Sequence, residues 1–157
     1  MRDIQKLDLL LAALGERYSI ANLRLPAHGA IGLRLKDGSE LYLEHEKAHG
    51  KLYAYMSVMA LPKEDAARLR VVTGMLEFNF LESGAVSIVL SVREDKAICQ
   101  MSFTIDRLEL DAFDRALQNL IASGPAIAAK LEARIRNEPA RAVTSRHSAA
   151  TLLAALK

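Results

Sequence analysis

Apolar residues recur every three to four positions in three parts of the chain, which predicts three amphipathic helices. The first is expected at residues 3–14, with Gly15 as its stop signal. The second is expected at residues 63–81, with acidic residues in its first turn, where the helix dipole favours them. The third is expected at residues 111–136, where Pro125 should kink or divide the helix because proline removes a backbone hydrogen bond.

Between these helices, apolar and polar residues alternate with a period of two, which predicts strands. Three strands are expected at residues 30–35, 39–46 and 51–61, joined by short turns as an antiparallel meander. Two more are expected at residues 85–92 and 97–105. The order therefore predicts an α+β fold: helix, three-strand antiparallel meander, helix, two strands, helix.

The second helix has two apolar stripes on roughly opposite sides, at about 100° per residue. One stripe contains Ala66, Leu69, Val72, Leu76 and Phe80. A surface helix of a monomer needs only one such stripe, so the other packs either against another element of the same domain or against a second copy of the chain, and we favour the second copy. Small residues flank this other stripe and would allow close helix approach. The predicted dimer interface consists of Ala67, Val71, Gly74, Met75 and Phe78.

The composition indicates a soluble globular protein, because 51% of the 157 residues are hydrophobic and 25% are charged. A chain of this length suits one domain, expected at residues 1–136, followed by a C-terminal extension at residues 137–157 that is flexible or a short helix. The N-terminus lacks the pattern of a signal peptide, and no apolar run approaches membrane-spanning length. We therefore expect a cytoplasmic protein that does not bind membranes.

The charge pattern argues against nucleic-acid binding. Residues 1–136 contain 18 Lys and Arg and 18 Asp and Glu, so the net charge of +2 comes from the extension. The basic residues are not clustered, and no patch is expected to attract phosphate. A single cysteine, Cys99, excludes an intramolecular disulfide and is expected to be a buried thiol in an apolar strand.

One short motif suggests metal chemistry: His45-Glu46-Lys47-Ala48-His49 matches H-E-x-x-H. This motif binds zinc when a helix places the two histidines on one face and a third ligand completes the site. Here the flanking residues alternate with a period of two, Lys47 interrupts the motif, and no third ligand is recognisable. We favour a polar turn between two strands, and we expect no catalytic residue, no metal and no cofactor. The alternative is a small zinc metallohydrolase that uses His45, Glu46 and His49.

The order of elements over residues 3–136 resembles the class I type III secretion chaperones, the Tir-chaperone (CesT-like) family of bacterial pathogens and symbionts. "IQKLDLLLAALGERY" resembles the opening helix of that family, and "LDAFDRALQNLIASGPAIAAKL" resembles its closing helix. The stretch "LRVVTGMLEFNFLESGAVSIVLSVREDKAICQMSFTI" resembles its middle block of a helix, a glycine-containing turn and two strands.

The resemblance implies a homodimer without enzymatic activity. Such a chaperone holds the N-terminal segment of a secreted effector in extended form, partly by strand addition to a sheet edge. The effector stays soluble and competent for the secretion ATPase. Besides the metallohydrolase, the sequence leaves open one more function, a dimeric regulatory adaptor on the same fold. The residues implied as effector contacts are Leu7, Leu9, Leu10, Leu14, Tyr53, Tyr55, Met101 and Phe103.

Overall fold

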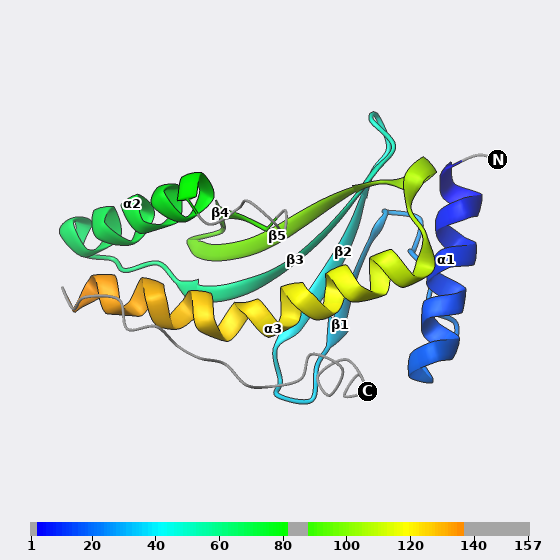
Figure 1. Ribbon diagram of the computed structural model, residues 1–157, viewed down its shortest axis with the longest axis horizontal. Helices are drawn as coiled ribbons and strands as arrows, with labels where there is room; N and C mark the ends of the chain where they lie inside the picture. The colour runs from blue at the N-terminus through cyan, green and yellow to red at the C-terminus, as the bar shows by residue number, and fades with distance from the viewer. Residues whose placement is uncertain (1–2, 82–87, 137–157) are drawn as a thin grey trace.

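The computed structural model describes residues 3–81 and 88–136 (Figure 1). The predicted extension at residues 137–157 and the start of the predicted strand at 85–92 lie outside these described residues. The order of elements confirms the predicted α+β fold. The elements are α1 (Asp3–Tyr18), β1 (Ala30–Arg34), β2 (Glu40–Glu46), β3 (Lys51–Ala60), α2 (Asp65–Leu81), β4 (Val89–Arg93), β5 (Lys96–Thr104), a short 3-10 helix η1 (Ile105–Arg107) and α3 (Leu110–Ile135).

The strands form one antiparallel sheet in the order β1-β2-β3-β5-β4 (Figure 1). The predicted meander is confirmed, because β1 pairs with β2 and β2 pairs with β3. The second hairpin joins the sheet through β5, which pairs with β3 along most of its length. Strands β1 and β4 are therefore the two edges of the sheet.

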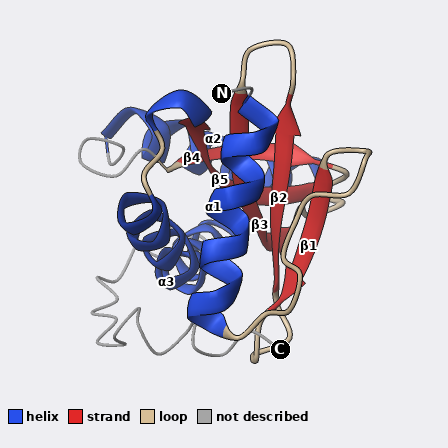
Figure 2. Cartoon of the chain, turned by 90° about the vertical axis from the view of Figure 1, so that its right-hand side faces the viewer, coloured by secondary structure: helices blue, strands red, loops and turns tan. Residues whose placement is uncertain are grey.

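The helices cover one face of the sheet and leave the other open (Figure 2). Helix α3 runs along β3 and β5, α1 packs near one end of α3, and α2 packs against the other end and against β4. The alternation of side chains sends one set of each strand into the core beneath the helices. This buried set includes Leu41, Leu43, Leu52, Ala54 and Cys99.

Helix α3 is continuous from Leu110 to Ile135. Of the two effects predicted for Pro125, a kink or a division of the helix, the division does not occur. Its apolar spine, from Phe113 to Leu131, lies in the core. The residue before the proline explains how the helix lies so close to the sheet. A side-chain Cβ at Gly124 would lie 3.3 Å from the sulfur of Met56 on β3. Glycine at this position lets the helix backbone approach the strand.

Helix α1 continues past Gly15 to Tyr18, so the prediction that Gly15 ends it was wrong. Gly15 is buried inside the helix. A Cβ there would lie 2.7 Å from the carbonyl oxygen of Ile20 and 2.9 Å from Cβ of Leu23. Both residues belong to the segment that follows the helix and packs back against it. The glycine is required for this close approach and not as a terminator.

A buried polar cluster joins α1 to α3, centred on Asp114, which is only 6% exposed. Its carboxylate accepts hydrogen bonds from the Tyr18 hydroxyl, from Nη1 of Arg17 at 2.6 Å and from Nε2 of Gln118 at 3.1 Å. Burial by itself would raise the pKa of Asp114, but these three donors more than offset burial and lower the pKa below its ordinary value. The cluster therefore favours the ionised carboxylate and fixes α1 against α3.

We expect Asp114→Asn to lower the free energy of unfolding by about 2 kcal/mol at neutral pH, because an amide nitrogen would face hydrogen-bond donors. The lowered pKa also means that Asp114 stabilises the fold above the unfolded-state pKa of about 3.9. This contribution is lost as the pH falls through the lower folded-state pKa. Urea unfolding at neutral and acidic pH measures both effects.

The matched control for this experiment is Asp111→Asn. Asp111 pairs with the same Arg17, but its side chain is largely exposed, so we expect a change below about 1 kcal/mol. Equal stability of Asp114→Asn and the wild-type protein across the pH range would contradict the role given to the buried carboxylate.

Candidate functional site

The structure divides the predicted partner contacts on α1 into buried and exposed residues. Leu7, Leu10 and Leu14 belong to the hydrophobic core and offer no surface to a partner in this conformation. Leu9 points away from the core and is 63% exposed. Ile4, which was not among the predicted contacts, is also exposed on this helix. The exposed large apolar side chains of α1 are therefore Ile4 and Leu9.

The predicted contacts on the strands lie on opposite faces of the sheet. Tyr53 and Tyr55 belong to the open face, whereas Met101 and Phe103 belong to the face that the helices cover. Met101 is buried, and the ring of Phe103 lies edge-on to that of Phe113 on α3 at a centroid distance of 5.1 Å. These four residues do not form one patch.

Tyr55 belongs to a hydrogen-bonded aromatic cluster on the open face. Its ring stacks on that of Tyr42 at 5.3 Å, and the Arg93 guanidinium lies 4.9 Å from the Tyr55 ring centroid. The Tyr55 hydroxyl donates to Glu44, which also accepts a bond of 2.8 Å from Arg93. Burial and the bond to Glu44 raise the pKa of Tyr55 to about 12. The cluster ties β2, β3 and β4 together on the face without helices.

Helix α2 turns its predicted subunit stripe inward, so the assignment of the two stripes needs correction. Ala67, Val71 and Met75 are buried within the described chain, and Phe78 is half-buried against the same core. Gly74 faces α3, since a Cβ there would lie 3.3 Å from Cγ of Arg134. The stripe assigned to a second copy therefore packs inside the monomer, because α3 and β4 cover it.

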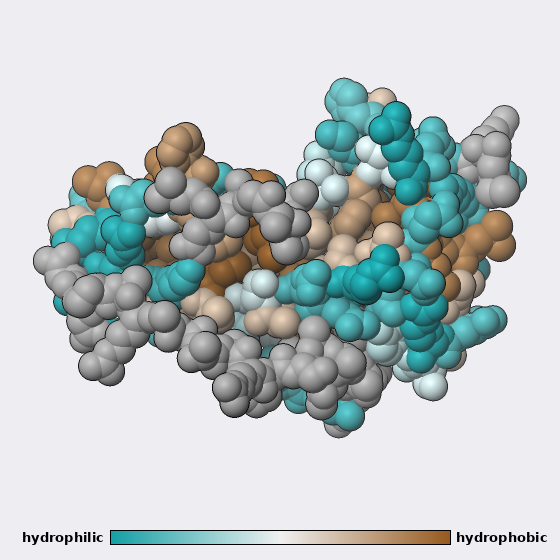
Figure 3. Space-filling view, in the orientation of Figure 1, coloured by the Kyte–Doolittle hydropathy of each residue, from teal (hydrophilic) through white to brown (hydrophobic). Residues whose placement is uncertain are grey.

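The outward stripe of α2 is the exposed one. Leu69, Leu76 and Phe80 are 68%, 65% and 85% exposed, and they recur at helical spacing along one side of α2. Apolar surface is visible over α2 in the space-filling view (Figure 3). Large exposed apolar side chains that gather on one helix are typical of an interface. This stripe is the candidate subunit interface.

The two edges of the sheet differ in whether their backbone groups are free. At the β4 edge, the side-chain amide of Asn79 on α2 donates to the Leu90 carbonyl oxygen at 2.9 Å and accepts from the Leu90 N–H at 2.7 Å. These two bonds occupy the outward-facing groups of Leu90. Helix α2 thus closes this edge at its centre.

At the β1 edge, the outward-facing groups are open in the part of the chain that the structure describes. Backbone bonds of 2.8 Å join His45 N–H to the Gly29 carbonyl and Leu35 N–H to the Ser39 carbonyl. Antiparallel pairs alternate between bonded and non-bonded, so the even-numbered residues of β1 direct their N–H and carbonyl groups away from β2. These outward-facing residues are Ala30, Gly32 and Arg34.

The H-E-x-x-H motif does not lie on a helix. His45 and Glu46 end strand β2 on opposite faces, and His49 lies in the following turn with Nδ1 2.7 Å from Oε2 of Glu46. The bond to His49 lowers the pKa of Glu46. No group of three possible metal ligands occurs within residues 3–81 and 88–136. The interpretation of the motif as a strand end and a polar turn is confirmed.

Cys99 is fully buried in the core, as predicted. It lies on β5 beneath the helices, and this burial raises the pKa of its thiol to about 12. The thiol is therefore protonated at neutral pH and is a structural residue.

These features define an α+β domain with an open strand edge and exposed apolar helix surfaces. The model of the Tir chaperone protein (CesT) family matches residues 9–125, and the chain belongs to this family. No curated protein matches the chain. The part of the chain that the structure describes has no helix long and apolar enough to cross a membrane.

Solved structures show the same fold at low sequence identity. A chain of the ExsC-ExsE complex is 18% identical with a TM-score of 0.68, covering 80% of this chain and 92% of that one. A chain of the heterodimeric ExoU-SpcU complex from the type III secretion system of Pseudomonas aeruginosa is 20% identical with a TM-score of 0.57, covering 78% and 94%. A chain of the Yersinia pestis type III secretion chaperone SycH in complex with a fragment of YscM2 is 12% identical with a TM-score of 0.60, covering 77% and 98%.

Proposed function

We propose that the protein is a cytoplasmic, non-catalytic chaperone of bacterial type III secretion that binds the N-terminal segment of a secreted effector in extended form. Membership of the Tir chaperone family is the observation that carries this proposal. The open β1 edge and the exposed apolar residues of α1 supply the kinds of contact that an extended segment needs. Binding keeps the effector soluble until the secretion ATPase receives it.

Co-expression with secreted proteins encoded by neighbouring genes tests this function. We expect one of them to become soluble and to co-purify, and limited proteolysis of the complex should leave its N-terminal segment protected. If no secreted protein is solubilised, the chaperone function is contradicted and a dimeric regulatory adaptor is favoured. Stoichiometric zinc in untagged protein that is lost in His45→Ala would instead favour the metallohydrolase.

The protein acts as a homodimer in this proposal, with the outward stripe of α2 as the interface. Leu69, Leu76 and Phe80 are largely exposed in the monomer, and burying one such side chain is worth about 1.5–3 kcal/mol. The inward stripe of α2 is already covered by α3 and β4. Among the described residues of α2, the outward stripe therefore supplies the large apolar side chains that remain available for burial in a dimer.

We expect Leu76→Glu to give a folded monomer, because the charge would have to be desolvated in the interface. Light scattering coupled to size-exclusion chromatography measures the mass, and circular dichroism checks the fold. The control is Leu9→Glu, an exposed leucine on α1, which should leave the dimer intact and weaken effector binding. A dimeric Leu76→Glu variant would refute this interface. Met75→Glu is unsuitable, because Met75 lies in the monomer core.

The extended segment pairs with β1 in this proposal and not with β4. Asn79 already occupies the outward-facing groups of Leu90 on β4. Strand β1 has no such cover from the described residues, and its even-numbered residues can each donate and accept a ladder bond. Added backbone bonds contribute affinity with little dependence on side chains.

We expect Arg34→Pro to weaken effector binding about fivefold or more, because proline removes an outward-facing N–H without touching the bonds between β1 and β2. The matched control is Arg34→Ala, which also removes the exposed ion pair to Glu40 but keeps the N–H. Isothermal titration calorimetry with the co-purified effector measures both variants. Equal affinities for Arg34→Pro and Arg34→Ala would contradict pairing at this edge.

A further inference from the structure

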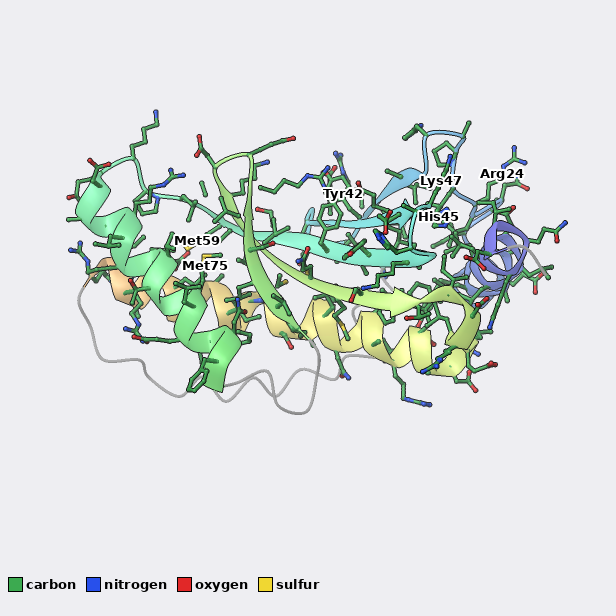
Figure 4. All side chains as sticks on the ribbon, turned by 90° about the horizontal axis from the view of Figure 1, so that it is seen from above. Arg24, Tyr42, His45, Lys47, Met59 and Met75 are labelled. Carbon is green, nitrogen blue, oxygen red and sulfur yellow. The ribbon has the colours of Figure 1, made fainter. Side chains whose placement is uncertain are left out.

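A hollow of about 370 Å³ lies between the start of α1, the connection before β1 and the end of β2. Ile4, Leu25 and Pro26 supply apolar walls, and His45 also lines the hollow. Asp8 and Lys47 place opposite charges on its rim. His45 and Lys47 lie close to α1 in the view from above (Figure 4). The hollow is large enough for one large apolar side chain with part of the backbone that carries it.

His45 is the unusual residue of this hollow. Both ring nitrogens are buried, and neither has a hydrogen-bond partner among the described residues. Buried polar groups of native proteins nearly always have a hydrogen-bond partner, so two buried nitrogens without one call for an explanation. A neutral imidazole has one N–H donor and one acceptor nitrogen. The missing partner must therefore offer one acceptor and one donor.

We propose that His45 is a recognition residue, whose ring pairs with the backbone of an extended polypeptide that places an apolar side chain in this hollow. A peptide backbone fits the requirement because each residue carries a carbonyl acceptor and an N–H donor. The hollow is lined by Gly29, immediately before the open-edged strand β1, so an extended segment is the fitting occupant. This inference rests on the proposed binding of an extended segment and adds a specific contact to it.

The outer wall of the hollow is an exposed turn, which gives the segment a way in. Pro26, Ala27 and His28 are exposed, and the Lys47 Nζ to Ala27 carbonyl bond is long at 3.5 Å. The turn is closed by a 2.8 Å bond from the Gly29 N–H to the Pro26 carbonyl. Gly29 remains anchored, because its carbonyl accepts the 2.8 Å bond from His45 N–H. Because the ring nitrogens of His45 are buried, binding in this proposal requires the exposed turn at Ala27 to move, while the β1–β2 ladder stays in place.

A titration of the full chain with a short alternating peptide tests the site without any effector. The probe is acetyl-Thr-Leu-Thr-Leu-Thr-amide, and the control peptide has threonine at all five positions. Nuclear magnetic resonance follows the histidine ring nitrogens and the isoleucine methyl groups. We expect the leucine peptide to shift the His45 ring and Ile4 methyl signals at millimolar concentration, and the threonine peptide to leave them unchanged.

Three variants separate recognition from a structural role. His45→Leu should keep or raise the melting temperature, since it removes an unpaired buried polar group, and should weaken binding of the leucine peptide about tenfold. His45→Gln keeps a donor and an acceptor and should retain most of the affinity. His49→Leu changes an exposed histidine in the adjacent turn and should alter neither property.

Two results would overturn the proposal. Peptide binding that is unchanged in His45→Leu, or no shift of the His45 and Ile4 signals, would show that the ring plays no part in recognition. Ring signals that already report two hydrogen bonds in the peptide-free protein would show that this chain, a second copy or bound water already satisfies the ring. The titration uses no effector, so its outcome is independent of whether a secreted protein co-purifies.

Discussion

The need to cover one face of a five-stranded sheet with a single long helix determines most of this structure. Helix α3 runs along β3 and β5 and buries its apolar spine there. Close contact depends on Gly124, which faces the sulfur of Met56 without an intervening side chain. With α3 in place, the other two helices pack at its two ends, α1 through the Asp114 cluster and α2 through Gly74 and Leu131.

This arrangement leaves specific surfaces without an internal partner. Helix α2 has apolar residues on two sides but only one side faces α3 and β4, so Leu69, Leu76 and Phe80 stay exposed. Helix α1 likewise buries Leu7, Leu11 and Leu14 and exposes Leu9. The sheet has one edge occupied at its centre by Asn79 and one edge open at β1. A small domain built in this way presents an exposed apolar helix face and an open strand edge as separate surfaces, on which the proposed self-association and partner binding rest.

The element order could be predicted because alternation and helical periodicity are local signals, whereas the direction of burial is not. The strands over residues 30–61 followed from period two alone. Helix α2 carries two similar stripes, so its sequence does not indicate which stripe meets α3, and the inward one was assigned to the dimer. Gly15 is typical of a helix end, but here it permits a contact with Ile20 and Leu23. No local pattern indicates that Asp114 would be buried, because its partners Arg17 and Tyr18 are almost a hundred residues away.

The H-E-x-x-H motif illustrates how the secondary structure of a segment changes the chemistry that the same residues can perform. On a helix, His45 and His49 would share one face and could bind a metal together. On a strand, His45 turns toward the core and Glu46 turns away, so Glu46 bonds His49 in the exposed turn. His45 is then left beside Ile4 and Leu25, with buried nitrogens and no partner within the described residues. The strand therefore separates the two histidines and places one of them where a bound polypeptide could satisfy it.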